Sequence, residues 1–497
     1  MNADMISGLL SILTPSGLLC VFAGTLIGLL IGAMPGLSAT MGIAILLPLT
    51  YSLGSYNGIA MLLSLYMGAM YGGSISAILI NTPGTPAAAA TSMDGYPLAR
   101  SGQASRALGI SLFASFVGGV ISTLFLLFLA PVLGKLALRF GAVETCAVAV
   151  LGITIIGSLS RGSAVLGLLS GVIGLLLAMI GQDTITGYPR YCFGILHLYS
   201  GIPYTAALIG LFSIPQAMRL IEAPAQKRTG DIKVSGKLLP DGKDLRKTFP
   251  TILMGSLIGT IVGIIPGSGG DTACWFSYNE AKRFAKDKTH FGLGDIRGVA
   301  ASESSNNAVV GGAMIPTVAL GIPGSSSTAI ILGALMIHGI VPGPTLMSEH
   351  GQITYALIWA LMLSNAAMFL EGIAVTKFAI NITKINDHII APAIVVLAVI
   401  GAFAVQNSMF DVIIMLVFGI IGYFMGKIGM PTAPMVIGLI LGSMMDSSLH
   451  QSLLLGHGSL TIFAQKPIAL VLLCLALLSI LQATPLFGMI RAKLRKR

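Results

Sequence analysis

Charged side chains are scarce in this chain of 497 residues, because Asp, Glu, Lys and Arg together make up only 9% of it. Soluble domains carry about 25% charged residues, so these few charges cannot cover the surface of a soluble protein of this size. Hydrophobic residues account for 55%. The scarcity of charge excludes a soluble enzyme, a disordered protein and a fibrous protein, and it indicates an all-α polytopic membrane protein.

Cysteine frameworks and metal-binding motifs are also lacking. The five cysteines are odd in number and scattered, which predicts neither a disulfide framework nor a zinc site. The seven histidines form no HExxH or similar motif. No cluster of carboxylates and no Ser/His/Asp arrangement is evident, so the sequence argues against a membrane-embedded enzyme. We expect no cofactor and no bound metal beyond a possible Na⁺.

Basic residues are missing from the start of the chain, where the first Lys or Arg is Arg100. Three later segments, 223–247, 280–297 and 491–497, hold seven, five and five of the 28 basic residues. All three flank long apolar stretches, which is the positive-inside pattern. We predict that these segments are cytoplasmic, that they bind no nucleic acid, and that the N-terminus, which lacks the basic region of a signal peptide, lies outside.

Long apolar runs recur along the chain, each close to the roughly 20 residues that cross a membrane core of ~30 Å. Several are short or broken by Gly and Pro, so we expect about ten to fourteen transmembrane or re-entrant helices. The runs lie near residues 16–34, 57–80, 107–133, 142–160, 163–181, 203–221, 248–266, 298–322, 353–375, 390–406, 411–426, 431–445 and 467–487.

An internal repeat is visible in the sequence. Residues 24–36 read GTLIGLLIGAMPG and residues 255–267 read GSLIGTIVGIIPG. A second pair follows in the same order, with GGSISAILINTPG at 72–84 and GGAMIPTVALGIPG at 311–324. Two matching elements in the same order predict a duplicated unit.

The repeat and the charges together predict the domain organisation. Residues 1–222 form an N-terminal membrane repeat, 223–247 a cytoplasmic basic loop, and 248–497 a C-terminal membrane repeat. The second repeat starts in the cytoplasm, after the basic loop. If the N-terminus lies outside, the two halves are inverted repeats with broken helices, as in many secondary transporters.

Each repeat contains two apolar stretches that a Pro-Gly pair interrupts before small hydroxyl or amide residues. Proline breaks a helix and glycine lets the chain turn. A helix that restarts there offers free N–H groups and the positive end of its dipole, and Ser or Thr can cap it or contact an anion. A single break is typical of a packing kink, but broken backbone at membrane depth must be buried or face a watery cavity, so four matched breaks favour a central substrate site.

The predicted substrate-binding residues follow from these breaks and from the polar run that precedes the last one. In the first repeat they are Pro35, Gly36, Ser38, Thr40, Asn81, Thr82, Pro83, Gly84 and Thr85. In the second they are Pro266, Gly267, Ser268, Gly269, Asp271, Thr272, Asn306, Asn307, Pro323, Gly324, Ser325, Ser326 and Ser327. No Lys or Arg stands in the breaks, so an anion there would be held by helix N-termini, hydroxyls and amides.

The polar run SESSNN at 302–307 has two compatible interpretations. Its glutamate and asparagines would be unfavourable in lipid unless functional or paired, which favours a site. They could equally cap a helix that starts after the second basic segment. Na⁺ would suit hydroxyls and Asn oxygens, whereas H⁺ coupling would need a titrating acid. The candidates for the coupling ion are Asn81, Asp271, Glu303 and Asn307.

The quoted blocks resemble the large membrane subunit of the tripartite tricarboxylate transporter family. The resemblance runs nearly end to end, and its most distinctive stretches are NTPGTPAAAATSMDGYP at 81–97 and SNNAVVGGAMIPTVALGIPGSSS at 305–327. It implies a multi-pass subunit of the bacterial inner membrane that works with a small four-helix membrane subunit and a periplasmic solute-binding protein.

The resemblance also implies an activity. Such a subunit is a secondary transporter, not an enzyme, and it imports a carboxylate, either a tricarboxylate such as citrate or a related organic acid, by alternating access. The expected coupling ion is Na⁺, with H⁺ as the alternative. An ion or solute channel remains the second functional class, because duplicated halves with broken helices also occur in channels.

Overall fold

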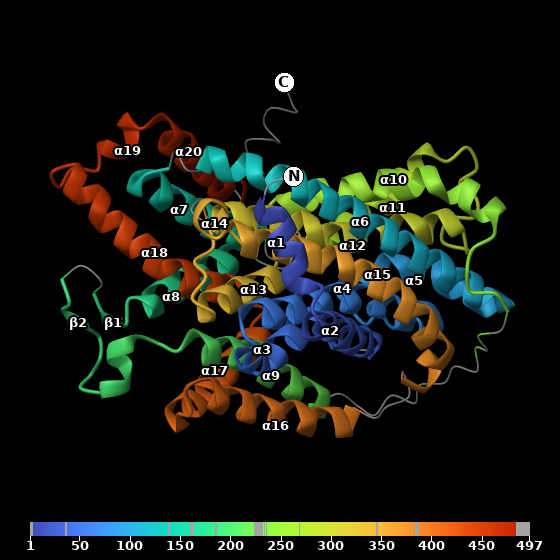
Figure 1. The fold of residues 1–497 in the computed structure, drawn as a ribbon, viewed down its shortest axis with the longest axis horizontal. Coiled ribbons are helices and arrows are strands. Elements are labelled where there is room, and N and C mark those ends of the chain that lie inside the picture. Colours follow the sequence, from blue (N-terminus) through green and yellow to red (C-terminus); the bar gives the residue numbers. More distant parts are fainter. Residues whose placement is uncertain are drawn as a thin grey trace.

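The structure is a computed structural model that describes residues 3–34, 37–137, 140–159, 164–183, 186–222, 236–267, 269–343, 346–382 and 387–483, with Ile232 and Val234. Residues 223–231, 233 and 235 of the basic loop predicted at 223–247, and the basic tail at 491–497, lie outside these residues. The described part of the chain is all-helical apart from one short hairpin (Figure 1), which confirms the predicted helical class.

The helices of the first half are α1 (Ala3–Ile12), α2 (Pro15–Ala33), α3 (Ala39–Leu53), α4 (Ser55–Ile80), η1 (Pro86–Ala88), α5 (Ala89–Leu98), η2 (Ala99–Gln103), α6 (Ala104–Ala137), α7 (Ala142–Leu159), α8 (Ala164–Ala178), η3 (Leu196–Ser200) and α9 (Tyr204–Glu222). The hairpin pairs β1 (Gly181–Gln182) with β2 (Pro189–Arg190) in antiparallel register, with Gly181 opposite Arg190.

The helices of the second half are α10 (Gly242–Ile264), α11 (Gly269–Phe284), α12 (Ile296–Leu320), α13 (Ser326–Ile337), α14 (Leu346–Glu349), α15 (Gly351–Ile382), α16 (Asp387–Gln406), α17 (Met409–Lys427), α18 (Ala433–Leu455), α19 (Ile462–Gln465) and α20 (Pro467–Ala483).

Helices α4 and α12 run through the middle of the molecule (Figure 1). Every residue of α4 from 58 to 79, and of α12 from 298 to 319, is buried. The two helices cross in antiparallel directions, because Asn306 on α12 donates to the carbonyl of Met70 on α4 at 3.0 Å and Asn307 donates to that of Met67 at 3.4 Å. Other helices therefore shield the polar run of α12 from lipid.

The two copies of the sequence repeat pack in the same way, because α2 lies along α4 and α10 lies along α12. Both contacts use glycines spaced four residues apart, namely Gly24, Gly28 and Gly32 in α2 and Gly255, Gly259 and Gly263 in α10. A Cβ on Gly28 would lie 2.3 Å from the carbonyl oxygen of Leu65, and one on Gly259 would lie 2.4 Å from that of Ser305. The glycines thus let the helix backbones touch, as small residues do between membrane helices.

Seven helical stretches among the described residues are long and apolar enough to cross a membrane: Pro15–Ala33, Ser55–Ile80, Pro86–Lys135, Tyr204–Glu222, Gly242–Ile264, Gly351–Thr376 and Met409–Lys427. Shorter apolar helices, among them α3, α8 and α13, accompany them. Helix α12 is long enough, but its polar run lowers its hydropathy and keeps it out of this set. The apolar runs expected from the sequence coincide with helices. The longer helices that restart after the breaks, α3, α11 and α13, lie outside those runs and were not expected as helices of their own.

Candidate functional site

A cavity of about 450 Å³ lies beside the first residues of four helices. Each of these helices follows one of the Pro-Gly helix breaks predicted from the sequence. The starts of α3, η1, α11 and α13 supply most of its wall, and α4, α9 and the loop before α18 supply the rest. The lining residues are Ser38, Ala39, Thr40, Tyr66, Met70, Thr85, Pro86, Ala87, Phe212, Arg219, Gly267, Gly269, Gly270, Asp271, Thr272, Ser325, Ser326, Ser327, Met430, Pro431, Thr432 and Ala433. Four segments that are distant in sequence therefore meet at one place.

The breaks before α3 and α13 are capped and joined to each other. Ser38 has extended backbone and its hydroxyl accepts a hydrogen bond from the N–H of Met41 at 3.2 Å. Ser325 forms a capping box with Thr328, accepting from its N–H at 3.2 Å while the Thr328 hydroxyl accepts from the N–H of Ser325 at 2.8 Å. The hydroxyls of Thr40 and Ser327 lie 2.9 Å apart, so a hydrogen bond links the two helix starts. The capping role predicted for the serines is confirmed.

The other two breaks turn through glycine. After α4, the chain folds back so that the N–H of Gly84 donates to the carbonyl of Gly73 at 3.1 Å. A Cβ on Gly84 would lie 1.9 Å from the carbonyl oxygen of Gly32, so only glycine fits there. After α10, Gly267 has φ of +79° and donates to the carbonyl of Gly324 at 3.0 Å. This bond joins the break before α11 to the break before α13.

The electrostatic character of the cavity comes from helix starts and two charged side chains. The first N–H groups of a helix have no partner within the helix, and they carry the positive end of its dipole. The two charged residues of the lining are Asp271, in the first turn of α11, and Arg219, near the end of α9. The cavity thus offers several N–H and hydroxyl donors, one positive and one negative side chain, and the donors and the guanidinium are groups that bind carboxylates.

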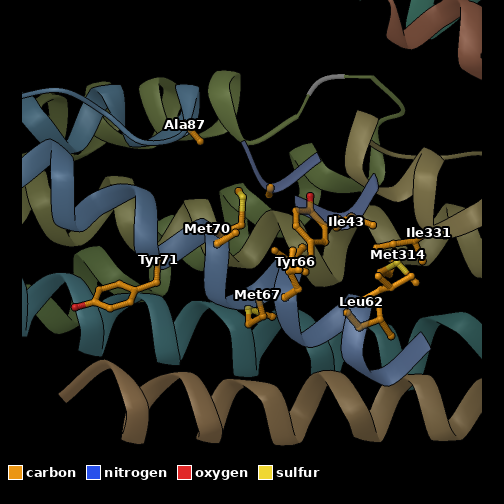
Figure 2. Packing of buried hydrophobic residues seen from close by; sticks show 14 of the residues in the cluster. Ile43, Leu62, Tyr66, Met67, Met70, Tyr71, Ala87, Met314 and Ile331 are labelled. Carbon is orange, nitrogen blue, oxygen red and sulfur yellow. The ribbon is translucent and has the colours of Figure 1, made fainter. Parts of the chain in front are cut away.

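The wall formed by α4 is amphipathic. Tyr66 points its hydroxyl toward the break before α13, 3.2 Å from the hydroxyl of Ser325. One turn further, Met70 points toward Ala87 (Figure 2). Both side chains line the cavity while Met67 and Tyr71 on the same helix belong to the surrounding apolar core. Helix α4 therefore gives the cavity one hydroxyl, from Tyr66, and one apolar side chain, from Met70.

The structure brings ten of the predicted substrate-binding residues into the lining: Ser38, Thr40, Thr85, Gly267, Gly269, Asp271, Thr272, Ser325, Ser326 and Ser327. It places Asn81, Thr82, Pro83, Gly84, Pro266, Asn306, Asn307, Pro323 and Gly324 outside the lining. Pro35, Gly36 and Ser268 lie outside the described residues. Asn81 ends α4 in the left-handed conformation with φ of +54°, the same position that Gly321 occupies at the end of α12.

The polar run of α12 does not cap a helix, so that interpretation is wrong. Asp295 is the residue that caps α12, accepting from the N–H of Arg297 at 2.9 Å. Burial alone would raise the pKa of Asp295, but the hydrogen bonds from Arg297 outweigh it and hold that pKa below its usual value. Glu303 lies two turns inside the helix, and its carboxylate accepts hydrogen bonds from Thr91 on α5 and Ser115 on α6.

Sequence reasoning missed Tyr66, Met70, Phe212, Arg219 and the segment 430–433. Arg219 stands at the end of an apolar run, where a basic residue is typical of a cytoplasmic boundary, so no signal separated it from the topology pattern. The segment at 430–433 had a signal, since Met-Pro-Thr-Ala-Pro interrupts two apolar runs as the other breaks do.

Comparison with known proteins gives a family and two relatives. A family model described as "Tripartite tricarboxylate transporter TctA family" matches residues 18–437. An Agrobacterium vitis protein described as "Uncharacterized 52.8 kDa protein in TAR-I ttuC' 3'region" is 35% identical over 494 residues, which are 99% of this chain and 98% of the relative. Another from A. vitis, "Uncharacterized protein in TAR-II ttuC' 3'region", is 33% identical over 235 residues, 47% of this chain and 96% of the relative. No solved structure matches.

Proposed function

Because the chain belongs to the TctA family, the large membrane subunits of tripartite tricarboxylate transporters, we propose that it is the permease of a binding-protein-dependent carboxylate importer. The family is one of transporters, and the chain is not an enzyme. The imported carboxylate is a tricarboxylate such as citrate or a related organic acid. An ion gradient drives its uptake by symport, with Na⁺ as the coupling ion and H⁺ as the alternative.

The observation that carries this proposal is the convergence of four helix starts on one cavity. Its volume of about 450 Å³ falls within the roughly 300–1,000 Å³ of small-molecule sites. A carboxylate there would accept from backbone N–H groups and from the hydroxyls of Ser325–Ser327, while Arg219 would pair with one of its charges. Asp271 disfavours an anion placed beside it, so we assign the carboxylates to the Arg219 side of the cavity.

Alternating access would arise from two inverted repeats. The proposal is supported by the identical glycine pairing of α2 with α4 and of α10 with α12. It is also supported by the antiparallel crossing of α4 and α12, because a half-turn in the membrane plane reverses the direction of equivalent helices. The cavity would then lie at the interface of the halves, and their relative movement would open it to either side.

The proposed partners are a small four-helix membrane subunit and a periplasmic solute-binding protein. They follow from the tripartite family to which the chain belongs. In this arrangement the permease is a multi-pass protein of the bacterial inner membrane, with the segments 223–247 and 280–297 in the cytoplasm.

The test is uptake of radiolabelled citrate, and of other di- and tricarboxylates, into vesicles that contain all three components. An imposed Na⁺ gradient is expected to drive accumulation above the external concentration, and collapse of the gradient is expected to stop it. Carboxylate flux that only ever follows its own gradient would identify a channel instead. If none of the carboxylates enters under either ion gradient, the proposed substrate class is wrong.

A further inference from the structure

A carboxylate buried among hydroxyl groups lies beyond the wall of the cavity. The side chain of Glu303 on α12 has no solvent exposure. Among the described residues, no Lys, Arg or His forms an ion pair with it. An isolated buried carboxylate is strongly unfavourable, because desolvation penalises the charge and no opposite charge offsets it. Within the described part of the chain, Glu303 thus has no positive side chain paired with it.

The side chains that hydrogen-bond to Glu303 or face its carboxylate with a hydroxyl come from three helices of the first half. Thr91 on α5 donates to one carboxylate oxygen, and Ser115 on α6 donates to the other at 3.1 Å. Ser74 on α4 and Ser111 on α6 face the same carboxylate. None of the four residues has solvent exposure, and the hydroxyls of Ser74 and Ser111 have no hydrogen-bond partner of good geometry.

We infer that Glu303, Ser74, Thr91, Ser111 and Ser115 form a binding site for one Na⁺ ion. Two carboxylate oxygens and four hydroxyl oxygens offer six ligands, and hard cations bind through oxygen in such numbers. A single carboxylate balances a monovalent cation. A proton on Glu303 would neutralise the charge too, but it would leave the Ser74 and Ser111 hydroxyls without partners, whereas a bound cation uses their lone pairs.

The site adjoins the cavity through two elements. Thr91 lies in the first turn of α5, four residues after the end of the cavity-lining segment 85–87. On α12, Asn306 lies one turn from Glu303 and binds the carbonyl of Met70, and its amide oxygen faces Gly270, 3.5 Å from where a Cβ on that residue would lie. Both Met70 and Gly270 line the cavity. An ion at Glu303 would therefore fix the helices that form the cavity wall.

The experiment measures thermal unfolding of the purified full chain in detergent, without carboxylate. NaCl replaces choline chloride or KCl at constant ionic strength. We expect Na⁺ to raise the Tm in a saturable way, because a ligand of the folded state alone stabilises it, and K⁺ and choline to have no such effect. Glu303→Gln is expected to abolish the Na⁺ response, and Ser74→Ala and Ser111→Ala to raise the half-saturating Na⁺ concentration by about tenfold or more.

Ser364→Ala is the matched control, since Ser364 is equally buried but bonds only the Leu361 carbonyl of its own helix α15. It should respond to Na⁺ as the wild type does. If Glu303→Gln does not fold, the two serine variants decide the outcome. The inference is overturned if the wild type unfolds at the same Tm in Na⁺ and choline, if the response survives in Glu303→Gln, or if acid alone stabilises the chain.

The inference rests on the proposed transport function only where it gives the Na⁺ ion a role in coupling. Binding of Na⁺ itself is measured without transport. Carboxylate uptake by the same wild-type protein, assembled with its partners, separates the two statements. Uptake without a Na⁺-dependent Tm overturns the ion site and leaves the proposed function standing. A Na⁺-dependent Tm that Glu303→Gln abolishes, without uptake of any carboxylate, overturns the proposed function and leaves the ion site standing.

Discussion

At the scale of single residues, Arg219 most changes the expected anion site. The sequence predicted a site without Lys or Arg, and the structure places Arg219 in the cavity lining. It is the basic side chain of the cavity lining, and it packs against α17, where a Cβ on Gly426 would lie 2.1 Å from its guanidinium. The guanidinium therefore lies against α17, while the residue as a whole is exposed. A guanidinium binds a carboxylate through two parallel hydrogen bonds, which a lysine cannot reproduce.

Replacing Arg219 tests this role directly. Arg219→Ala is expected to raise the KM for carboxylate uptake about tenfold to one-hundredfold, because a hydrogen bond to a charged group contributes about 1.5–3 kcal/mol. Arg219→Lys should recover part of the loss. Arg283→Ala is the control, since Arg283 is 72% exposed at the far end of α11 and pairs with Glu280. An unchanged KM in Arg219→Ala would remove this residue from the binding site.

At the scale of elements, the sequence predicted where helices break and which residues cap them, because Pro-Gly and Ser act on the backbone next to them. Ser38 and Ser325 cap α3 and α13 as this local chemistry requires. The sequence did not predict which break residues face the cavity. Thr85 and Asn81 have similar chemistry, yet Asn81 turns away as the left-handed end of α4. The direction of a loop side chain depends on packing between distant helices, which no local pattern encodes.

Outside the cavity, the side chain of Asp94 holds α5 to the segment before α12. The Oδ1 atom of buried Asp94 accepts hydrogen bonds from the N–H groups of Gly292, Gly294 and Asp295 at 2.8, 2.9 and 2.8 Å. Asp94→Ala would leave these donors unpaired and is expected to lower the free energy of unfolding by roughly 2–4 kcal/mol.

Thermal or denaturant unfolding in detergent measures this change. Asp94→Asn keeps one acceptor oxygen and should be intermediate. Asp287→Ala is the control, because Asp287 is 58% exposed and its carboxylate contacts only the nearby Thr289, by hydrogen bonds, and the exposed His290, at 3.7 Å. Its removal should change stability by less than about 0.5 kcal/mol. Equal stabilities for Asp94→Ala and the wild type would show that the loop is held by other contacts.

At the scale of the whole molecule, the hydrogen bond between Thr40 and Ser327 joins the two repeats across the cavity. Their oxygens lie 2.9 Å apart, which brings the two Cβ atoms near the roughly 3.5–4.5 Å that a disulfide requires. In a Cys474→Ser background, which removes the exposed native thiol, Thr40→Cys with Ser327→Cys is expected to crosslink on oxidation. Uptake should then stop and return after reduction with dithiothreitol.

Each single-cysteine variant serves as the control, since it cannot crosslink and should transport equally in oxidant and reductant. The crosslink is verified by mass spectrometry before uptake is measured. Undiminished uptake by fully crosslinked protein would mean that the starts of α3 and α13 move as one body. In that case the alternating movement would have to occur elsewhere in the chain.

The burial of α12 also bears on how the chain enters the bilayer during synthesis. A charged residue at the centre of an inserting helix is disfavoured by about 2.5–3.5 kcal/mol, and Glu303 is accompanied by two asparagines. The helices that pack most closely on α12, namely α6, α10 and α11, all precede it in the chain. The helices that contact α12 are therefore synthesised before it. When α12 leaves the ribosome, the hydroxyl and carbonyl groups that pair with its polar side chains are already present in the chain.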